Sequence, residues 1–115
     1  MSSITSYVKT QTVFWAEIAA AATGLLITYT LQDGPGLLTG GQAASVYTIT
    51  LPANATVALN RRFVYLQANS ATLGAQVQYD EAASAANTVV VRGTAFGGGV
   101  LDVGFYFELF AISML

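Results

Sequence analysis

Ten charged side chains set the limits on any chemistry this chain can perform. Six are acidic and four are basic, and the 115 residues include no histidine and no cysteine. Without histidine the commonest general base is missing, and a Ser-His-Asp triad is impossible. Without cysteine there is no thiolate nucleophile, no disulfide and no cysteine-ligated metal. Paired carboxylates are then the first candidates to consider.

The carboxylates are not spaced for acid–base catalysis. Asp102 and Glu108 have the same parity on one predicted strand, where six residues at ~3.3 Å each would separate them by ~20 Å. The two carboxyl groups of a glycosidase are only ~5–9.5 Å apart. Asp80 and Glu81 are adjacent and fall at a predicted strand end, where exposure to solvent is normal. We predict no catalytic residue and no enzyme activity.

Two glycine-containing segments also lack the features of ligand sites. The segment Asp33-Gly34-Pro35-Gly36 supplies one acidic side chain and no EF-hand spacing follows it, so it predicts a turn. The segment from Gly93 to Gly99 has no Lys-Ser/Thr ending and precedes a strand, so it is not a phosphate-binding loop. It predicts a flexible hairpin connection. We expect no cofactor and no metal.

Charge and hydropathy argue against nucleic acid and membrane as partners. The net charge is −2 and Arg61-Arg62 is the only cluster of basic residues, so little is available to neutralise phosphates. We predict that both arginines are structural and that each pairs with an acidic residue. The apolar stretch from Val13 to Ile27 contains Glu17 and falls short of the ~18 residues that a spanning helix needs. The N-terminus does not resemble a signal peptide, because Lys9 is followed by polar residues.

Short runs rich in Val, Ile, Tyr, Phe and Thr recur between Gly-, Ala-, Asn- and Ser-rich spacers such as Thr39–Ala44. Many runs alternate with period two, which is typical of half-buried antiparallel strands. The pattern predicts one domain over residues 1–115, an all-β, antiparallel, jelly-roll-like two-sheet sandwich of about eight strands. The expected strands are Tyr7–Ile18 (one strand or two), Leu25–Leu31, Val46–Leu51, Thr56–Leu59, Phe63–Gln67, Ala75–Tyr79, Thr88–Gly93 and Val100–Ile112.

Two parts of this assignment leave alternatives open. Between Val13 and Thr23, four consecutive alanines favour a helix, whereas the preceding residues are β-like. We predict a strand from Val13 to Ile18 followed by an alanine loop. The runs Phe63–Leu66 and Val89–Val91 are apolar on both faces, which predicts either a central strand or a strand covered by a neighbour.

The C-terminal segment from Phe105 to Leu115 is almost wholly apolar and strongly β-prone, so it would promote aggregation if exposed. We expect Val103, Phe105, Phe107 and Leu109 to face the core, which leaves the opposite face for a neighbour. Residues 110–115 extend past this core set, and we predict that they serve assembly more than the fold. The predicted interface residues are Trp15, Tyr106, Phe110, Ile112, Met114 and Leu115.

Charged residues make up only 9% of the chain, against ~25% in ordinary domains. A surface so poor in charge is easily desolvated and suits burial against other subunits. The alternative is the neutral, hydroxyl-rich exterior of a secreted monomer. Together with the apolar C-terminus, the charge deficit predicts a homo-oligomer.

A short, histidine-free, charge-poor β chain with hydroxyl-rich strands and an apolar last strand resembles the small structural proteins of tailed bacteriophage virions. Among these it is most similar to capsid decoration (cement) proteins, although no family motif is matched. The resemblance implies a trimer on the virion shell, in contact with the major capsid protein or another virion protein, assembled in the host cytoplasm. The alternative is a jelly-roll carbohydrate-binding or host-adsorption module, in which Trp15 and the tyrosines stack on sugars.

Overall fold

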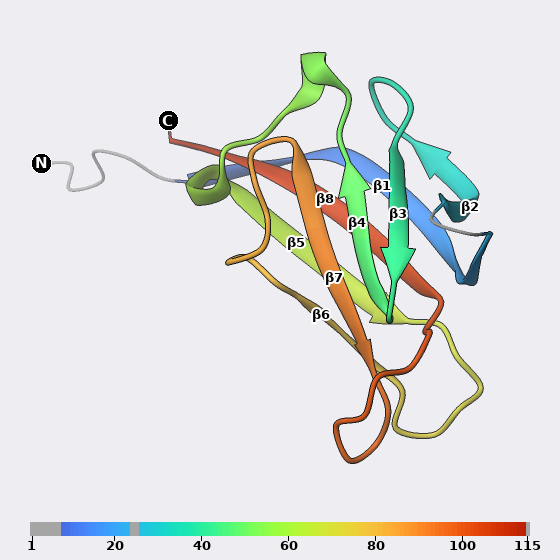
Figure 1. Cartoon of the computed structure of the whole chain (residues 1–115). Coiled ribbons are helices and arrows are strands. Elements are labelled where there is room, and N and C mark those ends of the chain that lie inside the picture. The colour runs from blue at the N-terminus through green and yellow to red at the C-terminus, as the bar shows by residue number, and fades with distance from the viewer. Residues whose placement is uncertain (1–7, 24–25, 115) are drawn as a thin grey trace, which may run out of the picture.

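A computed structural model describes residues 8–23 and 26–114, with the backbone alone at residues 8–9, 20–23, 26–33 and 113–114 (Figure 1). The described chain is all-β and forms two antiparallel sheets. The first sheet has the strand order β2-β1-β8-β5 and the second has the order β3-β4-β7-β6. The elements are β1 (Val8–Thr23), β2 (Leu26–Asp33), β3 (Thr39–Ala43), β4 (Val46–Thr50), η1 (Ala53–Ala55), η2 (Leu59–Arg61), β5 (Arg62–Ala68), β6 (Gln76–Tyr79), β7 (Thr88–Thr94) and β8 (Phe105–Met114).

Both sheets contribute to one hydrophobic core. In Figure 1, β3, β4 and β7 pass in front of β1 and β8, and buried side chains of β1, β4, β7 and β8 make up most of the core. Phe105 and Phe107 of β8 have no exposed surface, which confirms that they are core residues. The ring of Tyr47, from β4, meets Phe105 edge-on with the ring centroids 5.2 Å apart. Replacing such a buried phenylalanine by alanine costs ~3–5 kcal/mol.

Strand β1 continues through the alanine run. The predicted strand from Val13 to Ile18 is confirmed, but the predicted alanine loop is wrong, because Ala19–Thr23 extends the same strand. Alanine prefers a helix by less than ~1 kcal/mol per residue over most other residues, and such a preference yields to sheet pairing. Ala22 and Thr23 pair with β2, and the register shifts between Ile18 and Ala22.

The spacer Thr39–Ala44 contains a strand that the sequence did not indicate. Residues Thr39–Ala43 form β3 and pair with β4 along its whole length. The two strands are joined at Ala44 and Ser45, whose φ angles are 51° and 66°. Positive φ at both central residues defines the two-residue hairpin turn for which Asn-Gly is the usual signal. Because neither residue is Asn or Gly, the hairpin has no sequence signature.

One expected strand is absent and another begins later than predicted. Thr56–Leu59 is not a strand and instead leads from η1 into η2. The last strand begins at Phe105 and not at Val100, because the chain must first cross from the second sheet to the first. Within this crossover, Val100 makes an isolated bridge to Thr94. The short helices η1 and η2 are 3-10 helices, and no helix among the described residues is long and apolar enough to span a membrane.

Arg62, the first residue of β5, points into the protein and is 7% exposed. The prediction that it pairs with an acidic residue is wrong. Its guanidinium donates hydrogen bonds to four main-chain carbonyl oxygens, those of Val57 (2.5 Å), Ala85 (2.9 Å), Ala86 (3.2 Å) and Thr88 (2.8 Å). These carbonyls provide the negative partial charge that a carboxylate would otherwise supply.

In the turn after β2, the backbone of Gly34 lies directly against the ring of Phe14. A Cβ atom at Gly34 would lie 2.1 Å from Cδ1 of Phe14, a distance at which a side chain cannot fit. Glycine therefore lets the turn that was predicted at Asp33–Gly36 close over the core. Phe14 itself is fully buried.

Candidate functional site

The candidate site is the outer face of the first sheet, which points away from the shared core. Its side chains come from β1, β8 and β5, since neighbours along a strand point to opposite faces. The cross-strand register arranges them in three rows of three. We call these nine residues the aromatic face: Thr12, Phe110 and Phe63 in one row; Trp15, Glu108 and Tyr65 in the next; Glu17, Tyr106 and Gln67 in the third.

Five of these nine side chains are aromatic, and four of the five rings form two contacting pairs. Trp15 and Tyr106 stack with ring centroids 6.2 Å apart and an interplanar angle of 22°. Phe63 meets Phe110 edge-on at 6.0 Å. Phe63 is 57% exposed and Tyr65 is 48% exposed, so much aromatic surface remains in contact with water. Contiguous exposed apolar surface of this kind marks an interaction site.

Two carboxylates lie among the rings. Glu108 occupies the middle of the central row, and its Oε2 accepts a hydrogen bond from the Thr12 hydroxyl at 2.7 Å. Glu17 lies beside Tyr106 and raises the pKa of the phenol, because its negative charge disfavours the phenolate and its carboxylate accepts the phenolic hydrogen. The aromatic face thus combines flat rings with negative charge.

Three predicted interface residues share the aromatic face, namely Trp15, Tyr106 and Phe110. Ile112 is half-buried further along β8, opposite Thr10, and Met114 pairs with Val8 through the backbone. Leu115 lies outside the described residues. The sequence prediction missed Phe63, Tyr65 and both carboxylates of the face.

Phe63 and Tyr65 belong to the run Phe63–Leu66, and its apolar residues on both faces were the sequence signal that could have indicated them. Val89–Val91 is such a run, and its strand β7 is indeed central, between β4 and β6. Phe63–Leu66 lies in β5 at the edge of the first sheet, so the central alternative is wrong for this run. Its second apolar face is exposed in the isolated chain.

The C-terminal segment extends past the core residues of the last strand, as the sequence predicted, but it stays within the sheet. Phe110–Met114 is part of β8 and lies between two partner strands, and its expected role in assembly stays a prediction. On one side this stretch pairs with Val8–Thr12, and on the other side with Arg62 and Phe63. Its described part therefore contributes to the sheet as well as to the aromatic face.

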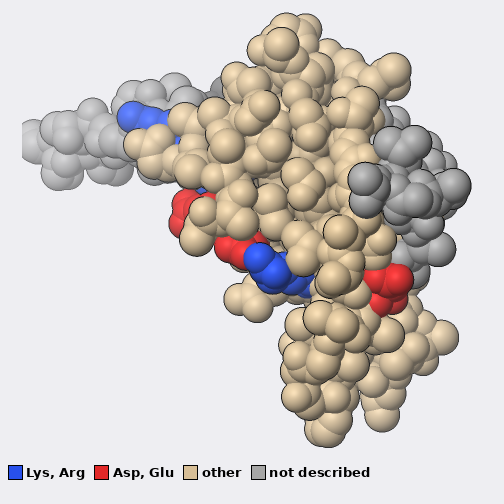
Figure 2. Space-filling model, viewed as in Figure 1, with Lys and Arg blue, Asp and Glu red and all other residues tan. Residues whose placement is uncertain are grey.

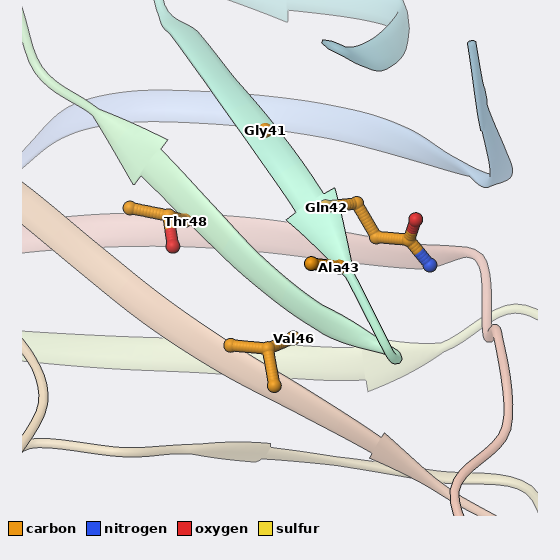
Figure 3. Close-up of a pocket in the computed structure, with 5 residues that line it drawn as sticks. All are labelled: Gly41, Gln42, Ala43, Val46 and Thr48. Carbon is orange, nitrogen blue, oxygen red and sulfur yellow. The ribbon is translucent and has the colours of Figure 1, made fainter. Parts of the chain in front are cut away.

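The second sheet has a shallow hollow of about 230 Å³ on its outer face (Figure 3). Gly41 has no side chain to fill the space beside Thr48, and Ala43 and Val46 complete an almost apolar lining. Figure 3 shows the fifth lining residue, Gln42, directed away from Val46 and Thr48. Its amide donates a hydrogen bond to Asp102. The hollow contains no charged side chain, so it offers no acid–base chemistry.

Two other carboxylates, those of Asp80 and Asp102, make structural contacts. Asp102 precedes β8 and accepts a hydrogen bond from the Ser45 hydroxyl at 2.9 Å, so the prediction that it shares a strand with Glu108 is wrong. Asp80 directly follows β6 and pairs with Arg92 at 2.6 Å. The described residues include no cluster of three or more His, Cys, Asp or Glu that could hold a metal ion.

No protein family, curated protein or solved structure matches this chain.

Proposed function

We propose that this chain is a structural subunit that docks onto a larger assembly through the aromatic face. The assembly we propose is a bacteriophage virion, in which a homotrimer of the chain serves as a decoration (cement) protein that stabilises the shell. The observation that carries the proposal is the exposed cluster of aromatic rings on the first sheet. Phe63 and Tyr65 remain about half exposed although they lie on a regular strand.

The energetics favour a partner on this face. Full burial of a large apolar side chain contributes ~1.5–3 kcal/mol, so half-exposed rings leave ~1 kcal/mol each to be gained on docking. Aromatic residues are enriched at the centres of protein interfaces for this reason. Five aromatic residues on one sheet face therefore offer a group of anchors to a complementary partner.

The scarcity of charge supports burial against other subunits. Uncharged residues cover most of the surface seen in Figure 2, and one of the four basic residues, Arg62, is buried. Arg92 is paired with Asp80. Such a surface loses little hydration energy when another protein covers it.

We further propose that the two sheets form a jelly-roll-like sandwich. The first and last strands, β1 and β8, pair in one sheet, while β4 and β7 pair in the other. The strands β5 and β6 then join the far sides of β8 and β7, respectively. Pairings nested in this way between distant segments are typical of Greek-key, two-sheet folds.

The docking proposal is tested by mass and by sedimentation. Light scattering gives the mass in solution, where we expect a trimer at micromolar concentration, and purified phage capsids are then pelleted with the protein. Phe63→Ser combined with Tyr65→Ser should abolish co-sedimentation. Leu37→Ser is the matched control, because Leu37 is 79% exposed and lies outside the aromatic face. A monomer contradicts the trimer, and equal pelleting of both variants contradicts docking through this face.

A second candidate function is carbohydrate binding, for host adsorption or a similar role. The observation in its favour is the stacked pair Trp15 and Tyr106 beside the polar groups of Glu17 and Gln67. Rings stack on the apolar faces of sugars while carboxylate and amide groups bind hydroxyls. Saturable binding on a glycan array, lost in Trp15→Ala, would favour this function over docking.

A further inference from the structure

Glu108, in the middle of the aromatic face, has no cation beside it among the described side chains. Glu108 is surrounded by rings, with Trp15 and Tyr65 across the strands and Tyr106 and Phe110 along β8. Its one recorded hydrogen bond comes from the Thr12 hydroxyl. The ion pair found among the described side chains, Asp80–Arg92, involves the second sheet.

This charge restricts what can cover the face. A purely apolar partner would bury the Glu108 carboxylate without a counter-charge, which is strongly unfavourable. A second copy of the chain stacked face to face would bring its own Glu108 carboxylate toward this one. Like charges brought together in a desolvated interface are strongly unfavourable. The favoured partner therefore brings positive charge.

We infer that the aromatic face receives an arginine side chain from a different protein, with its guanidinium on the Glu108 carboxylate. This inference rests on the proposed docking function and names the chemistry of the partner. Arginine fits better than lysine because its planar guanidinium binds a carboxylate through two hydrogen bonds and stacks on aromatic rings. Trp15 and Tyr65 flank Glu108 in the same row, so a guanidinium bound there lies against at least one ring.

A neutral sugar would use the same face differently. Sugar hydroxyls donate to a carboxylate and to an amide alike, so replacing Glu108 by glutamine should change sugar binding little. A bound guanidinium loses its counter-charge in the same variant. Glu108→Gln therefore separates the two ligands while it preserves the shape of the side chain.

Trp15 is the only tryptophan in the chain, so its fluorescence reports directly on the aromatic face. We would titrate the full-length protein with a tetra-arginine peptide and with its tetra-citrulline counterpart, which has nearly the same shape and no charge. The arginine peptide should give a saturable change that weakens with added salt. The citrulline peptide should give none.

The variants sharpen the test. Glu108→Gln should weaken arginine-peptide binding at least about tenfold, the change expected when an ion pair of ~1.4 kcal/mol is lost. Glu81→Gln is the matched control, since Glu81 is exposed in the loop after β6, and it should leave binding within about twofold of the wild type. Glu17→Gln provides a second test should Glu108→Gln fail to give the wild-type circular dichroism spectrum, and it should also weaken binding.

Several results would overturn the inference. One is equal binding of both peptides, and another is no fluorescence response to arginine. A third is a neutral oligosaccharide that binds the wild type and Glu108→Gln equally while the arginine peptide is silent. A fourth is self-association that Arg61→Ala abolishes, which would assign the cation to a second copy.

The inference and the docking proposal fail separately. When the arginine peptide is silent but capsids still pellet the protein through Phe63 and Tyr65, the docking proposal stands and the arginine inference is wrong. When the peptide binds through Glu108 but no capsid pellets the protein, the arginine site stands and the virion proposal is wrong.

Discussion

Replacing Arg62 by methionine should destabilise the fold more than any other change to a charged residue. Its guanidinium joins the start of β5, in the first sheet, to two segments of the chain. One is the connection around Val57 between β4 and β5, and the other is Ala85–Thr88, which leads into β7 of the second sheet. Methionine fills similar space but donates no hydrogen bond. The substitution therefore removes the cross-links while it keeps most of the packing.

The expected loss in the free energy of unfolding follows from the hydrogen bonds that Arg62 makes. A hydrogen bond to a charged group contributes ~1.5–3 kcal/mol, and four carbonyls accept from Arg62. The carbonyl oxygen of Ala85 still accepts a hydrogen bond from the main-chain N–H of Thr88, and that of Ala86 from the N–H of Val57. These two oxygens therefore lose only one of their two donors in the variant. The Nε of Arg62 is buried without a partner, and removing that group returns some free energy. We expect a net loss of ~3 kcal/mol, out of the ~5–15 kcal/mol typical of a domain.

Urea unfolding followed by Trp15 fluorescence and far-ultraviolet circular dichroism measures this loss. The matched control is Arg61→Met, because Arg61 is exposed on η2 and should change the free energy of unfolding by less than ~0.5 kcal/mol. Thermal scans should show Arg62→Met melting ~10–15 °C below the control. The reasoning is refuted when the two variants differ by less than ~1 kcal/mol in the free energy of unfolding.

Three further predictions concern the core, the last strand and pH. Phe107→Ala should cost ~3–5 kcal/mol, whereas Phe63→Ala should cost under ~1 kcal/mol in the isolated protein; similar costs in urea unfolding would show that the faces are assigned wrongly. Deleting residues 110–115 should abolish cooperative unfolding, because β1 and β5 lose part of their shared partner; a truncated chain with the wild-type circular dichroism spectrum would contradict this. The hydrogen bond from Arg92 lowers the pKa of Asp80 below its ordinary 3.8, so the pair stabilises the fold above that pH and the gain disappears as pH falls through the lower, folded pKa. Arg92→Gln should weaken this acid dependence of the urea midpoint, because the main-chain hydrogen bond from Ala83 still lowers the pKa of Asp80, and an unchanged pH profile would count against the prediction.

Alternation along single strands made much of the fold predictable. The register of β8 could be inferred from Phe105 and Phe107, because a one-residue slip would turn both rings to the outer face. The central position of β7 was likewise indicated by Val89–Val91. Such patterns report which side chains are buried, and burial follows directly from residue type.

The errors arise where neighbours override local preference. The alanines after Ile18 extend β1 toward Ala22 and Thr23, which pair with β2, and β3 forms around two glycines because β4 provides a partner. Arg62 finds carbonyl oxygens that the sequence cannot place beside it. In each case the deciding contact joins residues whose proximity depends on the tertiary fold.

Only part of the aromatic face could be predicted, for the same reason. Parity along one strand put Tyr106 and Phe110 on the face opposite the core. That Phe63 and Tyr65 join them depends on β5 pairing with β8, and that Glu108 lies at the centre depends on β1 pairing from the other side. Both pairings connect distant segments, so no local pattern could reveal the combination of rings and carboxylates.

The central claim is that the aromatic face is covered in the assembly, and the solvent accessibility of Trp15 tests it most directly. The chain is labelled with 5-hydroxytryptophan, which can be excited apart from ordinary tryptophan, and its quenching by acrylamide is measured for the free protein and for the capsid-bound protein. We predict that the quenching constant falls severalfold on binding, because the partner covers the half-buried Trp15. An unchanged quenching constant in a protein that is fully bound would contradict the account, since docking would then use another surface.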